Sequence, residues 1–368
     1  MTQKLYKVID LPDPVEMARL NAIEEPNAKK LAEDIYPPLA DWRTTIKLAE
    51  HYDTKMLNIL FAKYSSYQPN TYTFTKHLAE HIVNEYRHKI PILLYRPSIV
   101  VSSIFEPVPG WIDNFNGPIG LLIACGLGIL RTSHANPNVR ADIVPVDVCV
   151  QGLILAAYKV GNRTEEATPL DQSLEVVNCS NALIRTFCFG KIIELGRTII
   201  RKNPLEKCIW LPSGSITDNV IWHYVRFITG QMSLALIGDF LILIARRKPI
   251  LLKLQRRIFM SCQALYKFYT TQWLFLNENF LALKNLIPPE DLPKLGLFQN
   301  VDIDEETFYI NGIRGAKQFL LHEPLEATRS ARVRLQFLFF LNYFVQIAAA
   351  LLIGRFLFRY LCEWLFNV

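Results

Sequence analysis

A tyrosine and a lysine four residues apart are the side chains best suited to chemistry in this sequence. Tyr72 and Lys76 open a segment, 72–89, whose apolar residues recur at helical spacing and which Pro91 would end. Residues at i and i+4 share one helix face. An ammonium group there lowers the pKa of a neighbouring phenol and can bond a ribose, which favours proton transfer beside a nucleotide. The alternative is an ordinary pair on a helix surface, because chance predicts about one such spacing here.

The segments after this helix predict an α/β fold. Residues 92–101 (ILLYRPSIVV) form a short apolar run typical of a buried parallel strand, and helix followed by buried strand is half of a βαβ unit. Residues 141–160 predict a short strand and then an apolar helix from about residue 146, and 174–180 (LEVVNCS) predict one more strand. From about residue 209 the chain is helical, aromatic and basic. Residues 28–35 are also helix-leaning.

Two further groups of residues could form sites. His77 and His81 have the spacing of a metal-binding helix face, but the chain has only seven histidines, so we predict a polar helix face and no metal site. Trp111, Asn114, Gly117 and Pro118 place an aromatic ring and an amide beside Gly-Pro turns. They could line a substrate pocket or equally close a tight loop. HExxH, GxSxG and GxxxxGK[ST] motifs are absent from the sequence, so a zinc protease, an α/β-hydrolase and a P-loop protein have no support.

Composition indicates a membrane-associated or lipid-handling protein. Among the 368 residues 51% are hydrophobic, 12% aromatic and 20% charged, and the mean hydropathy is +0.15. The net charge of +6 suits an anionic membrane face or an anionic ligand, and the dispersed basic residues exclude nucleic acid as a partner. Seven cysteines without a CxxC pair indicate reduced thiols in an intracellular protein. The first residues lack the apolar core of a secretory signal.

The tail contains a candidate transmembrane helix. Residues 335–358 are apolar apart from Gln336, Asn342, Gln346 and Arg355, and arginines flank them on both sides. An interfacial hairpin and a buried core helix are the alternatives. A second apolar stretch, 232–245, contains Asp239 and ends in basic residues. We expect it to be too short to span a membrane and to be buried or to lie in the interface.

Together these segments resemble the alcohol-forming fatty acyl-CoA reductases that are abundant in insects. The resemblance runs in order from about residue 21 to the end of the chain. It rests on residues 35–38 (IYPP), 69–76 (PNTYTFTK) with 78–81 (LAEH), 95–100 (YRPSIV), 106–113 (EPVPGWID) with 116–118 (NGP) and Gly120, and 142–147 (DIVPVD).

The resemblance implies a reaction and a site. A long-chain fatty acyl-CoA would be reduced with NADPH, through a bound aldehyde, to a fatty alcohol. Tyr72 would protonate the carbonyl oxygen and Lys76 would hold the nicotinamide ribose. Pro97, Ser98, Ile99 and Val100 would lie against the nicotinamide, and the Trp111 to Pro118 group stays a candidate substrate pocket. It also implies a membrane-anchored intracellular protein on the endoplasmic reticulum or the peroxisome, facing the cytosol, with a homo-oligomer allowed.

The resemblance implies three parts of the chain, and the sequence differs from the family's pattern near its start. Residues 1–208 would be a partial Rossmann-type, extended short-chain dehydrogenase domain, 209–322 a helical C-terminal domain, and 335–358 the membrane helix. The first glycine is Gly110, so the family's Gly-rich phosphate loop is absent, as is a catalytic Ser or Thr before residue 35. We therefore expect that the first strands are missing and that the sequence belongs to a longer reductase. The alternative is a catalytically inactive short form that binds acyl-CoA or partners a full-length reductase at the membrane.

Overall fold

The computed structural model describes residues 6–7, 41–65, 68–162, 174–181, 187–295 and 304–366, which form two compact units. The first unit is drawn from residues 1–100, 138–189 and 260–302, and the second from 101–137, 190–259 and 303–368. Residues 28–35 and 35–38, which the sequence analysis singled out, lie outside the described residues.

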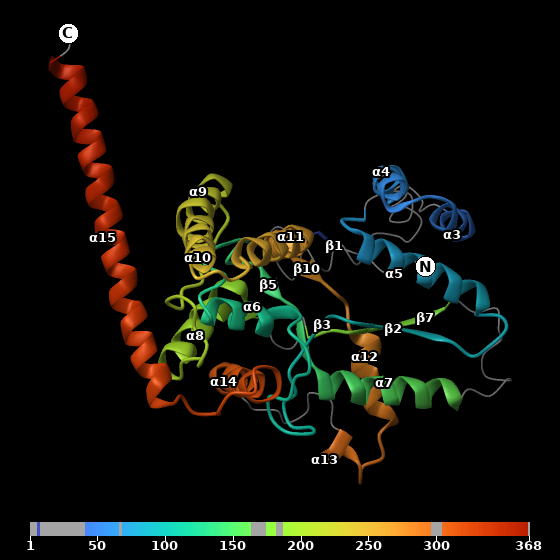
Figure 1. Ribbon diagram of the computed structural model, residues 1–368. Helices are drawn as coiled ribbons and strands as arrows, with labels where there is room; N and C mark the ends of the chain where they lie inside the picture. Colours follow the sequence, from blue (N-terminus) through green and yellow to red (C-terminus); the bar gives the residue numbers. More distant parts are fainter. Residues whose placement is uncertain are drawn as a thin grey trace. The chain divides into compact units, whose positions relative to one another are not determined.

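A parallel strand pair between helices forms the centre of the first unit. β2 (Leu93–Pro97) pairs in parallel with β7 (Glu175–Cys179) along its whole length, from Leu93 opposite Glu175 to Pro97 opposite Cys179. In Figure 1 this pair lies between α5 (Thr71–Tyr86) and α7 (Val146–Gly161). The predicted helix after Tyr72, the parallel strand, the helix from Val146 and the strand at 174–180 are therefore confirmed.

The predicted single strand at 92–101 is wrong in one respect, because the chain changes partner in its middle. Ser98 N donates to Cys179 O at 2.9 Å, whereas Ile99 N donates to Asp142 O at 3.0 Å. The second half, β3 (Ile99–Val101), pairs with β6 (Ile143–Pro145), which leads directly into α7. The apolar sequence of residues 92–101 does not indicate that its two halves pair with different strands.

Short strands and helices complete the first unit. Its core includes Val144, Val177, Cys179 and Phe280, each 0% exposed. The remaining elements are β1 (Tyr6–Lys7) paired with β10 (Trp273–Leu274), β5 (Arg140–Ala141) paired with β8 (Phe187–Cys188), α3 (Trp42–His51), α4 (Thr54–Tyr64), α12 (Glu278–Ala282), the 3-10 turn η2 (Leu283–Leu286) and α13 (Leu292–Leu295).

The second unit is mainly helical, as the sequence predicts for the chain after residue 209. Ile119, Leu122, Ile200 and Ile313 form part of its core. Its elements are α6 (Gly117–Gly126), most of α8 (Phe189–Lys202), the parallel pair β4 (Ser133–His134) and β9 (Ile216–Thr217), α9 (Val220–Arg226), the π-turn η1 (Phe227–Met232), α10 (Ser233–Ile244), the start of α11 (Leu251–Thr270), α14 (Glu305–Gly315), the π-turn η3 (Ala316–Leu320) and α15 (Arg329–Phe366).

Two helices of the second unit are long and apolar enough to cross a membrane. One is α15 over Arg329–Phe356. Only 12% of its most apolar stretch is buried, which contradicts the buried-core alternative for the tail. The other is Val220–Ile244, with 17% buried. The expectations that the stretch 232–245 is too short to span a membrane and that it is buried are therefore wrong, whereas the expected position in the interface stays a prediction. The stretch continues backwards through η1 into α9, so that Gly230 and Gln231, which look like an interruption, lie inside one helix.

A glycine that the fold requires lies just before Trp111. Gly110 has φ +84°, and a Cβ added there would lie 2.0 Å from Asn311 O. Gly110→Ala combines a left-handed backbone with a clash against another main chain, so we expect it to destabilise the protein by about 2 kcal/mol or more. Gly161→Ala is the matched control, because a Cβ at Gly161 meets nothing within 4 Å. Thermal unfolding in detergent compares the two; equal effects would contradict the close packing at Gly110.

Candidate active site

The tyrosine and lysine singled out by their spacing do share one face of α5. Asn70 caps this helix by accepting from Thr73 N at 2.9 Å, which sets Tyr72 in the first turn. Lys76 Nζ lies 5.8 Å from the centroid of the Tyr72 ring. The Tyr72 side chain is 68% exposed, so its hydroxyl is open to a ligand from outside. The geometry is that of a phenol and an ammonium that one small molecule can contact together.

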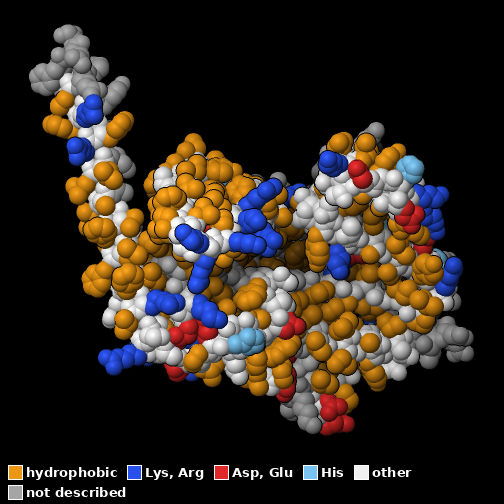
Figure 2. Space-filling model, in the orientation of Figure 1, with side chains coloured by type: hydrophobic (Ala, Val, Ile, Leu, Met, Phe, Trp, Pro, Cys, Tyr) orange, Lys and Arg blue, Asp and Glu red, His pale blue; other side chains and the backbone are white. Residues whose placement is uncertain are grey.

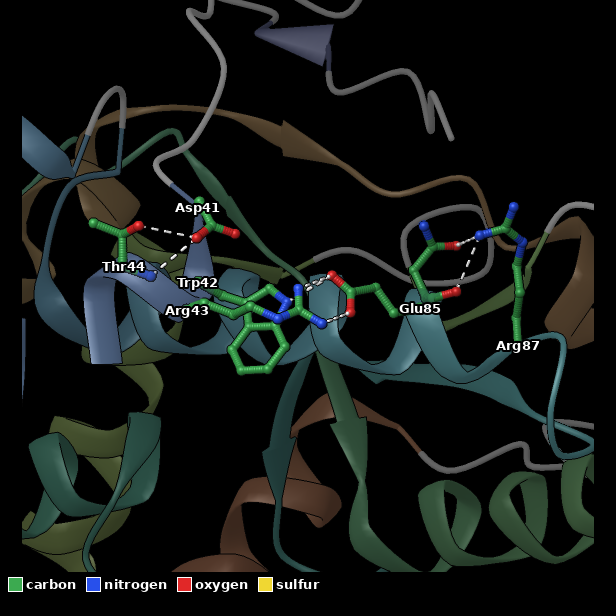
Figure 3. A network of polar contacts seen from close by, with 7 residues as sticks. Asp41, Trp42, Arg43, Thr44, Glu85 and Arg87 are labelled. Carbon is green, nitrogen blue, oxygen red and sulfur yellow. Dashed lines mark hydrogen bonds and ion pairs between the residues drawn. The ribbon is translucent and has the colours of Figure 1, made fainter. Parts of the chain in front are cut away.

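An ion pair with α3 holds the other end of α5. Glu85 accepts from both guanidinium nitrogens of Arg43, at 2.8 and 2.6 Å, and from Trp42 Nε1 at 2.8 Å (Figure 3). Hydrogen bonds from Arg43 and then Trp42 lower the pKa of Glu85 to about 2. Bidentate arginine–carboxylate pairs have a defined geometry. This exposed pair joins α5 to α3 at a point nine residues after Lys76.

A second ion pair joins α5 to the strands. Arg96 on β2 bonds Glu80 on α5, with Nε to Oε1 at 2.7 Å and a second bond from its terminal nitrogen. Both side chains are partly buried, which makes such a pair better defined than an exposed one. Arg96 directly precedes Pro97 and Ser98. The pair thus connects the helix that carries Lys76 to the strand that ends at the predicted nicotinamide turn.

A buried carboxylate organises the strand ends. Asp142 is 8% exposed and accepts from Ser98 Oγ at 3.0 Å, Ser180 Oγ at 2.5 Å and Asn181 N at 2.9 Å. These donors come from the end of β2 and the end of β7. Asn277 then donates to Ser180 O at 2.7 Å. Burial raises the pKa of Asp142, and the hydrogen bonds from Ser180, Asn181 and Ser98 oppose that rise.

This cluster lies where open α/β sheets bind ligands, at the carboxyl ends of parallel strands. Of the residues predicted to face the nicotinamide, Ser98 and Ile99 are half-buried, and Pro97 and Val100 are exposed. The hydroxyl of Ser98 is positioned by its hydrogen bond to Asp142. Sequence reasoning assigned no role to Asp142, Ser180 or Asn181; the signal was a polar residue directly before the apolar strand 143–145.

The predicted pocket residues belong to the second unit, where they build a tight loop. Ser103 Oγ accepts from Trp111 N at 3.0 Å and donates to Val108 O at 2.6 Å. Asn114 Oδ1 accepts from Asn116 N at 2.9 Å, just before Gly117, which has φ +74°, and Pro118 begin α6. Pro118 is buried and Asn114 exposed. The tight-loop alternative therefore describes the local geometry, and a substrate role for these residues stays a prediction.

The histidine pair forms a polar contact on α5. His77 and His81 lie with their Nε2 atoms 3.3 Å apart, and Gln68 Nε2 lies 2.9 Å from His77 Nδ1. Burial and then the neighbouring His81 lower the pKa of His77. Within the described ranges no group of three or more His, Cys, Asp or Glu side chains could hold a metal ion.

Comparison with known proteins identifies the class. Two family models, both described as male sterility protein, match this chain: an NAD-binding model over residues 21–153 and a Sterile model over 231–323. Fatty acyl-CoA reductase 1 of Xenopus laevis is 34% identical over 330 residues, and that of Homo sapiens is 33% identical over 333, in each case 89% of this chain and 62% of the relative. A putative fatty acyl-CoA reductase of Drosophila melanogaster is 30% identical over 322 residues, or 87% of this chain and 62% of the relative.

These matches support a fatty acyl-CoA reductase, and residues 21–153 match a Rossmann-type NAD-binding family. The chain spans about three fifths of the length of these curated relatives. The family resemblance drawn from the sequence is confirmed.

The raised pKa of Asp142 predicts a pH dependence of stability. Its ordinary value is 3.8, and the folded state binds the proton more tightly than the unfolded chain. The stability of the wild type relative to Asp142→Asn should therefore be highest below about pH 4 and fall as the pH rises through the folded pKa. Chemical unfolding of both proteins between about pH 4 and pH 7 measures this difference. A difference that stays constant or grows with pH would contradict the buried carboxylate.

Proposed function

We propose that this protein is an NADPH-dependent, alcohol-forming fatty acyl-CoA reductase. A long-chain fatty acyl-CoA is reduced through a bound aldehyde to a fatty alcohol and free coenzyme A. The observation that carries the proposal is the Tyr72–Lys76 pair on one exposed face of α5, in a chain of this family. The apolar composition and the positive net charge agree with a lipid substrate that bears phosphates.

The side chains present fit the nicotinamide end of the cofactor. Lys76 offers an ammonium that can bond both ribose hydroxyls, and Tyr72 offers an exposed hydroxyl on the same helix face. Pro97, Ser98, Ile99 and Val100 offer a turn that Asp142 holds rigid through Ser98. NADPH bound there would supply one hydride to the thioester carbon, and a second NADPH, bound after NADP+ has left, would supply the hydride that reduces the aldehyde.

Tyr72 and Lys76 have separate roles in this proposal. After the first reduction the C–S bond of the thioester breaks, and the coenzyme A sulfur leaves as a thiolate that takes up a proton. In the second step Tyr72 donates its hydroxyl proton to the aldehyde oxygen, so that no alkoxide has to form. Lys76 holds the ribose and stabilises the phenolate that Tyr72 leaves behind. Trp111, Asn114, Gly117 and Pro118 would contact the acyl substrate.

The proposal includes a membrane anchor and a domain organisation. Ala331, Leu338 and Asn342 of α15 are buried, and Asn342 Oδ1 accepts from Trp210 Nε1 at 3.0 Å, so the first turns of α15 belong to the folded second unit. The apolar residues after Asn342 would enter the bilayer of the endoplasmic reticulum or the peroxisome, with the rest of the protein in the cytosol. The proposed family division is residues 1–208, 209–322 and a membrane segment within 335–358, and a homo-oligomer is compatible with it. It differs from the two compact units, because residues 101–137 and 190–208 belong to the second unit and 260–302 to the first.

Loss of the Tyr72 hydroxyl should remove activity without unfolding the protein. We expect Tyr72→Phe to reduce alcohol formation by at least about 100-fold, the usual contribution of a general acid. Tyr158→Phe is the control, because Tyr158 is an exposed tyrosine of the same unit, on α7. Fatty alcohol from acyl-CoA and NADPH is measured by mass spectrometry, with thermal unfolding alongside. Full turnover in Tyr72→Phe would remove this residue from the mechanism.

Charges in the distal part of α15 should release the protein from membranes. Leu351 and Leu352 are each 69% exposed, and each lysine at the centre of a spanning helix costs about 3 kcal/mol. Alkaline carbonate should extract a larger fraction of the double variant Leu351→Lys/Leu352→Lys than of the wild type. Val333→Lys/Phe337→Lys adds the same charge to exposed positions before Asn342 and should stay in the pellet. Release of both variants, or of neither, would contradict an anchor beyond Asn342.

A further inference from the structure

The helix formed by α9, η1 and α10, residues Val220–Ile244, has the reverse of the usual distribution of side chains. Its buried positions include His223, Gln231, Ala235 and Asp239, which recur at multiples of four residues and therefore share one stripe. Helices on water-soluble proteins bury apolar residues and expose polar ones. Here the polar residues face the protein.

The buried polar groups attach the helix firmly to the second unit. Gln231 Oε1 accepts from Arg131 N at 2.9 Å, and Gln231 Nε2 donates to Gln255 Oε1 at 2.7 Å. The Asp239 carboxylate accepts from three consecutive main-chain N–H groups, those of residues 250, 251 and 252, each at 2.9 Å. The first of these N–H groups belongs to the residue just before α11 and the other two to the first residues of α11, where N–H groups have no partner within the helix.

The outward side of the same helix is mainly apolar in two stretches, Val220–Ile228 and Leu236–Ile244, with Arg226 and Thr229 exposed in or beside the first. Figure 2 shows hydrophobic side chains gathered over α9 and α10, with Lys and Arg side chains beside them. Thirteen large apolar side chains between residues 220 and 250 are exposed: Val220, Ile221, Trp222, Tyr224, Val225, Ile228, Leu236, Ile237, Phe240, Leu241, Leu243, Ile244 and Ile250. An apolar surface of this extent on a folded protein marks an interaction site.

We infer that the α9–α10 helix lies in the plane of a bilayer interface, with its outward side among lipid acyl chains, and that it does not cross the membrane. Crossing would pull Gln231 and Asp239 away from Arg131, Gln255 and the start of α11 and leave them in hydrocarbon. Each polar group without a partner there costs several kcal/mol. Lying flat keeps every one of these bonds and still removes the apolar side from water.

Charge favours a lipid surface over a second copy of the chain. Asp239 is the single acidic residue between Val220 and Phe259, and its carboxylate is already bonded to main-chain N–H groups. Arg226, Arg246, Arg247 and Lys248 are exposed beside the apolar side. Two copies placed face to face would bring these like charges together, whereas anionic headgroups neutralise them.

The second unit also connects this helix to the proposed anchor. Arg131 donates its main-chain N–H to Gln231, and its guanidinium donates to Asn342 of α15 at 3.3 Å. A protein anchored by α15 would therefore carry the α9–α10 helix at a fixed position relative to that anchor. The inference does not depend on the reductase activity.

Depth measurement with tryptophans on the outward side tests the inference. Ile221→Trp, Leu236→Trp and Ile244→Trp place a probe at the start, near the middle and at the end of the helix, at positions 73%, 60% and 64% exposed, where a larger ring fits. The full chain is reconstituted in phosphatidylcholine vesicles with about 30% phosphatidylserine. Quenching by lipids brominated near the headgroup is compared with quenching by lipids brominated near the chain end, after subtraction of the wild-type signal.

A flat helix predicts the same depth at all three positions, with quenching at least about twofold stronger for bromine near the headgroup. A spanning helix predicts that Leu236→Trp is quenched best near the chain end and the other two near the headgroup, and this pattern would overturn the inference. Absence of bromolipid quenching at all three positions, with a dimer in sedimentation, would assign the surface to a second copy instead. Phe115→Trp, at an exposed position of the same unit outside the helix, is the control.

Discussion

The buried carboxylate of Asp142 is the interaction on which the first unit depends. It precedes β6, accepts from the residue between β2 and β3, and accepts from the two residues after β7. One side chain therefore joins three parts of the chain that are distant in sequence: residue 98, residue 142 itself and residues 180–181. A buried carboxylate without hydrogen-bond partners destabilises the fold, whereas one that accepts from three donors holds those donors in defined positions. The hydrogen bond from Ser98 Oγ to Asp142 therefore positions the turn at Ser98, which is proposed to face the nicotinamide.

Sequence alone predicted the elements that repeat a pattern and missed those that depend on distant partners. The spacing of Phe74 and Leu78 gives α5, and the apolar run before Asp147 gives β6 and α7, because local periodicity determines both. The break at Ser98 and the cluster around Asp142 arise from contacts between residues 38 or more positions apart, which no local pattern records. The family resemblance identified Tyr72 and Lys76, which four-residue spacing by itself could not distinguish from a surface pair.

The helix Val220–Ile244 of the second unit shows the same limit of sequence-based prediction. Gln231 and Asp239 are polar residues that interrupt the run of apolar residues in the stretch 220–244. In the structure they are the groups that bind the helix to its unit, so they support a continuous helix and do not break it. A hydropathy window averages around the helix and therefore cannot separate a polar inner side from an apolar outer side. Burial separates the two sides and leads to the flat orientation that we infer.

The central claim is that this chain reduces a fatty acyl thioester twice with hydride from NADPH. The direct measurement uses NADPH that carries deuterium at the transferred position, a long-chain acyl-CoA and the membrane-reconstituted protein, with the fatty alcohol analysed by mass spectrometry. The account predicts an alcohol with two deuterium atoms on carbon 1, because both hydrides arrive at the same carbon. Absence of labelled alcohol, or an aldehyde with one deuterium as the final product, would contradict it.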